Sequence, residues 1–216
     1  MSNINRLGRP LIVSDCDEVL LHMVAPFRAW LNEAHDIRFD MSGGDFTGAM
    51  TKAGTGDQIS PEGIWAYLNE FFDGEMHRQM PIAGAVEAVA ALGEHADVVV
   101  LTNLLDHRQE HRRQQLAAHG IDVKVYTNQG PKGPALKAII EEYRPGRTIF
   151  VDDLAQHHGS VADLAPEVGR LHLCGEPELA PHITCALKAG HAHARIDQWS
   201  AALPWLLSRI HEEPHD

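Results

Sequence analysis

Acidic, hydroxyl and amine side chains follow the ends of several short apolar segments that are typical of buried strands. In an open parallel sheet, the carboxyl ends of the strands lie at one edge, where ligands bind. We therefore expect these side chains to share one site. They are Asp15 and Asp17 after residues 11–13, Thr102 and Asn103 after 98–101, Asp152 and Asp153 after 149–151, and Lys132 just before a helical pattern.

This set favours a metal-assisted reaction at a phosphate group. Several carboxylates on one rim repel one another unless a cation lies among them. Oxygen ligands favour a hard ion, and a site with room for water and a phosphate oxygen is typical of Mg²⁺ rather than Ca²⁺. Lys132 adds a compact positive charge, and the Thr102 hydroxyl can donate to a phosphate oxygen. Taken singly, each residue could equally begin a turn or face solvent, and only the joint pattern indicates catalysis.

Alternating strand and helix patterns must position this set. Strands joined by helical crossovers predict a mainly parallel sheet with helices on both faces, an α/β fold of the three-layer Rossmann-like kind. The expected strands are 11–13, 98–101, 123–126, 149–151 and 171–174, and the expected helices are 83–92, 106–119, 134–143 and 198–211.

Residues 21–80 interrupt this alternation. They contain a helical pattern at 26–34, a glycine-rich loop, and a second helix whose start is marked by Ser60 as N-cap and Pro61 at the first helical position. We predict a small helical cap here, inserted after the first strand, and a catalytic core made of residues 1–20 and 81–216. The alternative is that these helices simply add to the core.

Four motifs occur in a fixed order along the chain: Asp15-x-Asp17-x-Val19, Thr102 at a strand end, Lys132, and the pair Asp152-Asp153. In this order they resemble the signature motifs of the haloacid dehalogenase (HAD) superfamily, over residues 11–20 and 81–175. The compact insert after the first motif also resembles, loosely, that of deoxyribonucleotide-specific 5′-nucleotidases.

The resemblance implies a phosphatase mechanism. Asp15 would attack the phosphorus and form an aspartyl-phosphate, and Asp17 would protonate the leaving oxygen and later deprotonate the attacking water. Dehalogenating members lack the second aspartate, so Asp17 favours phosphate transfer. The alternatives are a phosphomutase and a non-catalytic member of the same fold that binds a phosphorylated metabolite.

The resemblance also implies the ligand sets. Mg²⁺ would be held by the Asp15 side chain, the Asp17 backbone carbonyl and the pair Asp152 and Asp153, with Asp153 favoured as the direct ligand. The substrate phosphate would be bound by Thr102, Asn103 and Lys132.

Two features depart from the family pattern. Glu18 stands where glycine is frequent, and His157 and His158 follow the fourth motif in place of a further aspartate. The histidines could be metal ligands, although we favour surface histidines on loops, because short His spacings are common among 15 histidines.

The cap is expected to choose the substrate, a small phosphorylated metabolite such as a nucleotide, sugar phosphate or phospho-acid. Arg28, Phe46, Lys52, Trp65 and Phe72 are candidate contacts, each with the alternative of a packing or surface role.

The composition argues against two other classes of partner, nucleic acid polymers and membranes. A net charge of −12 without a basic cluster argues against a nucleic acid polymer, and no apolar run approaches the length of a membrane span. Three cysteines without metal-ligand spacing and no secretory signal indicate the cytoplasm, and we expect a monomer or homodimer.

Overall fold

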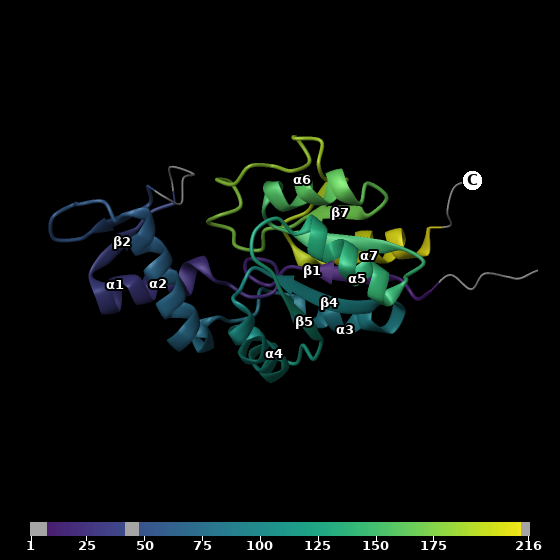
Figure 1. Cartoon of the computed structure of the whole chain (residues 1–216), viewed down its shortest axis with the longest axis horizontal. Helices are drawn as coiled ribbons and strands as arrows, with labels where there is room; N and C mark the ends of the chain where they lie inside the picture. The colour runs from purple at the N-terminus through teal and green to yellow at the C-terminus, as the bar shows by residue number, and fades with distance from the viewer. Residues whose placement is uncertain (1–7, 42–47, 213–216) are drawn as a thin grey trace, which may run out of the picture.

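The computed structural model describes residues 8–41 and 48–212, which are built around a six-stranded sheet (Figure 1). Its strands run in the order β5-β4-β1-β6-β7-β8, and every pairing is parallel. This confirms the α/β fold class. The strands are β1 (Leu11–Ser14), β4 (Asp97–Thr102), β5 (Lys124–Thr127), β6 (Thr148–Asp152), β7 (Gly169–His172) and β8 (Ala194–Arg195).

Helices cover both faces of the sheet. They are α3 (Ala85–His95), α4 (Gln109–Ala118), α5 (Gly133–Tyr143), α6 (Ala155–Leu164) and α7 (Trp199–His211), with short 3-10 turns η1 (Met76–Arg78) and η2 (Asp106–Arg108). Ile12 of β1 packs in one apolar cluster with Leu92 of α3, whereas Val13 packs in another with Leu136 of α5. Successive residues of a strand face opposite sides, so β1 is apolar throughout because both sides are buried.

A second group of elements follows β1 and lies to one side of the sheet (Figure 1). It consists of α1 (Val24–His35), β2 (Ile37–Phe39), β3 (Met50–Lys52) and α2 (Pro61–Gly74), and these four are called the cap elements below. The antiparallel hairpin of β2 and β3 was not expected from the sequence. Part of the glycine-rich loop, including Gly43 and Gly44, lies outside the described residues. The division into core and cap at residues 20 and 81 stays a prediction.

The cap elements have an apolar cluster of their own. The rings of Phe27 and Phe71 meet edge to face at 5.3 Å, and the N-cap Ser60 accepts a hydrogen bond from the amide of Gly63 at 3.2 Å. The cluster continues into the loop after β7 through Leu179. The two helices therefore bury their apolar faces mainly against each other and this loop.

Two local expectations change. Helix α6 was not expected, because its apolar residues do not recur at a clear helical period. Strand β7 begins at Gly169 instead of at residue 171. Within residues 8–41 and 48–212, no helix has the length and apolar character needed to cross a membrane.

Candidate active site

The ends of β1 and β6 place Asp15 and Asp152 next to each other. Ser14 lies opposite Val151 in the parallel register, and the amide of Asp15 donates to the Val151 carbonyl at 2.8 Å. Both carboxylates reach Lys132, whose Nζ lies 2.7 Å from Asp15 Oδ1 and 2.7 Å from Asp152 Oδ2. Lys132 is 0% exposed. Three residues predicted from the sequence thus form one buried, ion-paired group.

Asp153 completes a cluster of carboxylates. One oxygen from each of Asp15, Asp152 and Asp153 lies within 4.8 Å of the others. Asp152 has both oxygens engaged, one by Lys132 and the other by the Leu154 amide at 2.8 Å. No residue in the described parts of the chain donates a hydrogen bond to the Asp153 carboxylate. This buried, oxygen-only donor set, with more negative charge than Lys132 can balance, fits a hard divalent cation such as Mg²⁺.

Burial and mutual repulsion of the carboxylates shift the pKa values of this cluster when no cation is bound. Burial raises the pKa of Asp15 to about 7, although the ammonium of Lys132 acts against the rise. Burial together with the charge of Asp152 raises the pKa of Asp153 well above its ordinary value. Burial also acts to raise the pKa of Asp152, but Lys132 outweighs it and the pKa is lowered. A divalent cation would favour the charged form of each carboxylate.

Thr102 and Asn103 follow β4 at the same edge of the sheet. Thr102 is buried, and its hydroxyl makes no hydrogen bond to any described residue, which leaves it available to a ligand. Asn103 instead holds the loop that leads to Lys132: its Nδ2 donates to the Gly130 carbonyl at 3.0 Å, and its Oδ1 accepts from Asn128 at 2.8 Å. Phosphate binding by Asn103 therefore stays a prediction, and its visible role is to shape that loop.

Asp17 faces a different set of partners. Nη2 of Arg112 donates to both carboxylate oxygens, at 3.0 and 3.1 Å, and Gln79 Nε2 donates to Oδ1 at 2.7 Å. Arg112 is fully buried, whereas the side chain of Asp17 is 17% exposed. The sequence analysis missed both partners. The spacing of Arg108, Arg112 and Leu116 was the available signal, because residues four apart share a helix face and Leu116 is core.

The face of α4 that carries Arg112 also meets α2. Arg108 donates to Asp73 Oδ1 at 2.6 Å and to Asn69 Oδ1 at 2.9 Å, and the ring of Phe72 lies 5.7 Å from the guanidinium of Arg112. Phe72, a candidate substrate contact, is therefore packed against the arginine that holds Asp17. Cap helix α2 and the partners of Asp17 form one contiguous group.

His157 and His158 correct the sequence interpretation. They are buried on α6 and do not lie on a surface loop. The ring of His158 is hydrogen-bonded through Nε2 to the Asp152 carbonyl at 2.9 Å, and burial lowers the pKa of both histidines. In the described residues, the clusters that could hold a metal ion do not include them. His158 thus supports the end of β6, next to the acidic cluster.

The remaining cap candidates are not gathered on the acidic cluster. Arg28 pairs with Glu178 at 2.5 Å, Lys52 is exposed, and Trp65 is 67% exposed on α2. Phe46 lies outside the described residues. Arg28 and Glu178 line a cavity of about 370 Å³ between α1 and the loop after β7.

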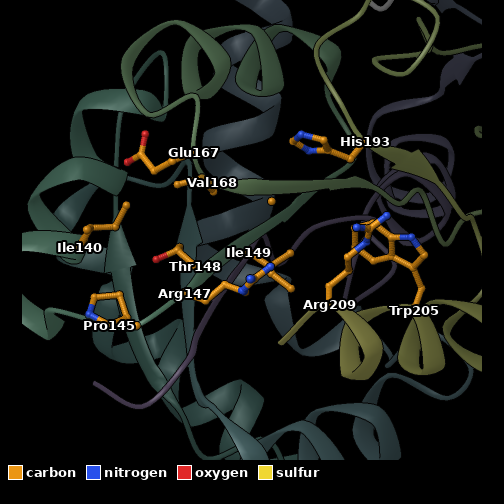
Figure 2. A pocket seen from close by; sticks show the side chains of 12 residues that line it. Ile140, Pro145, Arg147, Thr148, Ile149, Glu167, Val168, His193, Trp205 and Arg209 are labelled. Carbon is orange, nitrogen blue, oxygen red and sulfur yellow. The ribbon is translucent and has the colours of Figure 1, made fainter. Parts of the chain in front are cut away.

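Another cavity, of about 450 Å³, lies at the opposite edge of the sheet. Figure 2 shows its lining, which includes Thr148 at the start of β6, Val168 just before β7, and Arg209 of α7. Because β6 runs from Thr148 to Asp152, the cavity and the acidic cluster lie at opposite ends of that strand. It is not part of the site described above.

Comparison with solved structures shows the same architecture in other proteins. A haloacid dehalogenase-like protein of unknown function from Agrobacterium tumefaciens matches with a TM-score of 0.67 and 18% identity, over 95% of this chain and 100% of that one. A protein described as a phosphoglycolate phosphatase from Haemophilus somnus matches at 0.63 and 12%, over 94% and 100%. A protein named as a β-phosphoglucomutase from Thermotoga maritima matches at 0.62 and 12%, over 92% and 99%.

The chain has a HAD-like fold. A HAD-type hydrolase from Bacillus subtilis that shares it was solved bound to magnesium. No family model and no curated protein sequence matches the chain. The particular likeness to deoxyribonucleotidases is not shown. In this HAD-like fold, the acidic cluster lies at the carboxyl edge of the sheet, beside the position where the cap elements leave and rejoin it.

Proposed function

We propose that the protein hydrolyses a small phosphomonoester, with Asp15 as nucleophile and Mg²⁺ as its metal ion. The observation that carries this proposal is the buried group of Asp15, Asp152 and Asp153 around Lys132 at the carboxyl edge of a HAD-like sheet. A carboxylate nucleophile forms an aspartyl-phosphate and divides the hydrolysis into two easier steps. Phosphatases and phosphomutases among the similar structures support phosphoryl transfer as the class of reaction.

Asp15, Asp153 and the backbone carbonyl of Asp17 would hold Mg²⁺ directly. Asp152 would act mainly by holding Lys132, since both its oxygens already accept hydrogen bonds. When bound, Mg²⁺ neutralises charge on the phosphoryl oxygens and on the surrounding carboxylates. Lys132 would then keep the Asp15 carboxylate in place and draw the phosphoryl group toward it.

The first step forms a bond between an Asp15 oxygen and phosphorus, and breaks the bond from phosphorus to the leaving oxygen. Asp17 supplies the proton that the leaving oxygen needs. In the second step a water molecule attacks the phosphorus, Asp17 takes its proton, and the Asp15 carboxylate is released with inorganic phosphate. The free hydroxyl of Thr102 is placed to donate to a phosphoryl oxygen in both steps.

A phosphomutase is the second candidate, because a protein named as a β-phosphoglucomutase shares the fold. Such an enzyme would return the phosphoryl group from Asp15 to a sugar hydroxyl. The two reactions differ in product: a phosphatase releases inorganic phosphate in proportion to substrate consumed, whereas a mutase yields an isomeric sugar phosphate with little free phosphate.

The proposal is tested with a panel of nucleotides, sugar phosphates and phospho-acids in the presence of Mg²⁺. We expect phosphate release from at least one class, lost to background in Asp15→Asn, which removes the nucleophile with almost no change in volume. Asp163→Asn, an exposed residue on α6, is the matched control and should keep full activity. Tight binding of a phosphomonoester without turnover would instead identify a binding protein and overturn the enzymatic proposal.

A further inference from the structure

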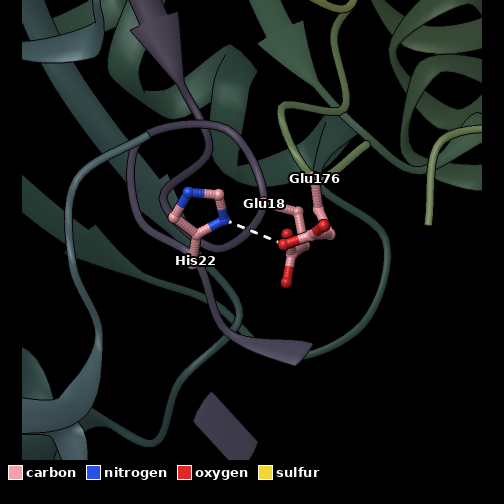
Figure 3. A group of neighbouring side chains, drawn as sticks. All are labelled: Glu18, His22 and Glu176. Carbon is pink, nitrogen blue, oxygen red and sulfur yellow. Dashed lines mark hydrogen bonds and ion pairs between the residues drawn. The ribbon is translucent and has the colours of Figure 1, made fainter. Parts of the chain in front are cut away.

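A second cluster of ionisable side chains lies next to the acidic cluster but shares no residue with it. Ligand atoms of Glu18, His22 and Glu176 lie within 4.8 Å of one another, and Figure 3 shows the three side chains directed at a common point. Glu18 belongs to the loop after β1, His22 to the segment that enters α1, and Glu176 to the loop after β7. The cluster therefore joins the segment between β1 and α1 to a loop that lies far along the chain.

Main-chain hydrogen bonds hold these segments together. The amide of His22 donates to the Met80 carbonyl at 2.9 Å, and the amide of Gly175 donates to the Glu18 carbonyl at 2.6 Å. The two connections to the cap elements thus lie side by side, and the loop after β7 crosses them. The residues that carry the ligand atoms are therefore held in place by main-chain contacts.

Glu18 carries the decisive observation, an unused buried oxygen. Its Oε1 accepts hydrogen bonds from the amides of Met23 and Val24 at 2.9 and 2.5 Å, and so caps α1. Its Oε2 is buried and finds no donor among the described residues, and the residue as a whole is only 2% exposed. The carboxylate lies beside that of Glu176 and the ring of His22 (Figure 3). A buried carboxylate oxygen beside a second carboxylate, without a cation, is costly.

Glu18 also has a backbone conformation that side chains rarely adopt, with φ of 60°. The left-handed region favours glycine and costs other residues about 1 kcal/mol or more. The cap on α1 accounts for Oε1, but it leaves Oε2 without a partner among the described residues.

We propose that Glu18, His22 and Glu176 bind one divalent transition-metal ion of the Zn²⁺ class. Two carboxylates and one imidazole nitrogen balance its charge and form the three-ligand set, with water in the open position, that Zn²⁺ takes outside purely structural sites. An imidazole ligand favours Zn²⁺ over Mg²⁺, whereas the oxygen-only cluster of Asp15, Asp152 and Asp153 has the opposite preference. Ligand atoms about 2.0–2.2 Å from a tetrahedral ion lie about 3.3–3.6 Å apart. The three ligand atoms, now within 4.8 Å of one another, would close on the ion by side-chain shifts.

The ion would replace the contact between His22 Nδ1 and Glu176 Oε2, which are 3.0 Å apart. It would link the segments that lead into and out of the cap elements to the loop after β7, directly beside the loop that carries Asp15 and Asp17. The proposal does not require that the protein be a phosphatase, because it concerns metal binding by residues outside the acidic cluster.

The test is a Zn²⁺ titration of chelator-stripped protein in excess Mg²⁺, followed with a chromophoric chelator as competitor. We expect the wild type to bind one equivalent more than His22→Gln and one more than Glu176→Gln. Co²⁺ in place of Zn²⁺ should give a visible absorption band that both variants lose. Glu176→Gln keeps the shape of the side chain and an acceptor for His22, so this variant should disturb folding least.

Two control variants separate this site from other sources of Zn²⁺ binding. His95→Gln alters a histidine whose ring lies 5.0 Å from that of His211, a pair unrelated to the cluster, and Asp153→Asn alters the acidic cluster. Both should retain the additional equivalent. Equal Zn²⁺ binding and an unchanged Co²⁺ spectrum in wild type, His22→Gln and Glu176→Gln would show that the three residues form only an ion pair and a helix cap. That result would leave the activity of Asp15 untouched.

Discussion

Asp15 and Asp17 are separated by one residue, yet their surroundings have almost nothing in common. Asp15 lies among other carboxylates with Lys132 as the nearest cation, in a group built from the ends of β1 and β6. Asp17 is matched by a buried arginine and a glutamine, which come from α4 and from the segment that follows the cap elements. The proposed nucleophile is thus positioned by the sheet, and the proposed acid/base by helix packing and by the segment that follows the cap elements.

The difference indicates that the two aspartates depend on different parts of the molecule. The Asp15 group has surplus negative charge, so the activity that depends on it should vary with the Mg²⁺ concentration. The Asp17 group is already neutral and geometrically fixed, since one guanidinium nitrogen contacts both carboxylate oxygens. Its behaviour should follow the cap, because Phe72 of α2 packs against Arg112.

Among the variants that test this contrast, Asp17→Asn should change the kinetics most. The amide cannot carry the proton, so kcat should fall by about 10² to 10⁴, the usual contribution of general acid/base catalysis. Metal binding should be spared, because the backbone carbonyl remains. Steady-state kinetics at several Mg²⁺ concentrations measure both quantities, and a near-normal kcat would remove Asp17 from the chemistry.

Asp153→Asn should act through the metal instead. We expect the Mg²⁺ concentration for half-maximal activity to rise at least about tenfold to a hundredfold, in line with losses seen when a metal site is perturbed. Excess Mg²⁺ should restore part of the activity, which distinguishes this variant from Asp17→Asn. An unchanged Mg²⁺ requirement would place the ion elsewhere.

Thr102→Val tests the free hydroxyl at the end of β4. A hydrogen bond to a charged group contributes about 1.5–3 kcal/mol, so kcat/KM should fall by about 10- to 150-fold. The similar volume of valine keeps the strand end packed. Thermal unfolding that matches the wild type, together with full activity, would show that the hydroxyl does not touch the substrate.

The smallest effect is expected for Arg112→Lys, which keeps the buried charge but replaces the planar guanidinium, one nitrogen of which contacts both Asp17 oxygens, by an ammonium on a shorter side chain. Asp17 would be held less firmly, so kcat should fall by about tenfold with little change in KM. Gln79, the second partner of Asp17, would remain. A purely structural arginine would lower the melting temperature and leave the kinetics of the folded fraction unaltered.

The sequence predicted what depends on strand order. We could predict that Asp15, Asp152 and Lys132 share one site, because parallel strands end at one edge of the sheet and the motifs occur at or near those ends. The structure confirms the parallel sheet and places these three residues in contact. Local pattern and strand topology were sufficient for this part of the site.

Other parts depend on tertiary packing that local patterns indicate weakly or not at all. Arg112 lies in a strongly polar helix and would ordinarily be assigned to solvent, and Gln79 lies in a connection between elements. His157 and His158 were misplaced because α6 has little apolar periodicity, although one face of this helix is buried. Glu18 could be flagged only as a departure from the family, and its capping of α1 required the structure.

The central claim is that Asp15 itself accepts the phosphoryl group. Acid quenching of the enzyme during turnover with Mg²⁺ and its best substrate, followed by peptide mapping by mass spectrometry, tests it directly. The account predicts an acid-stable, base-labile phosphoryl group on the peptide that contains Asp15, absent when Mg²⁺ is chelated. A phosphoryl group on any other residue, or steady turnover by Asp15→Asn, would contradict it.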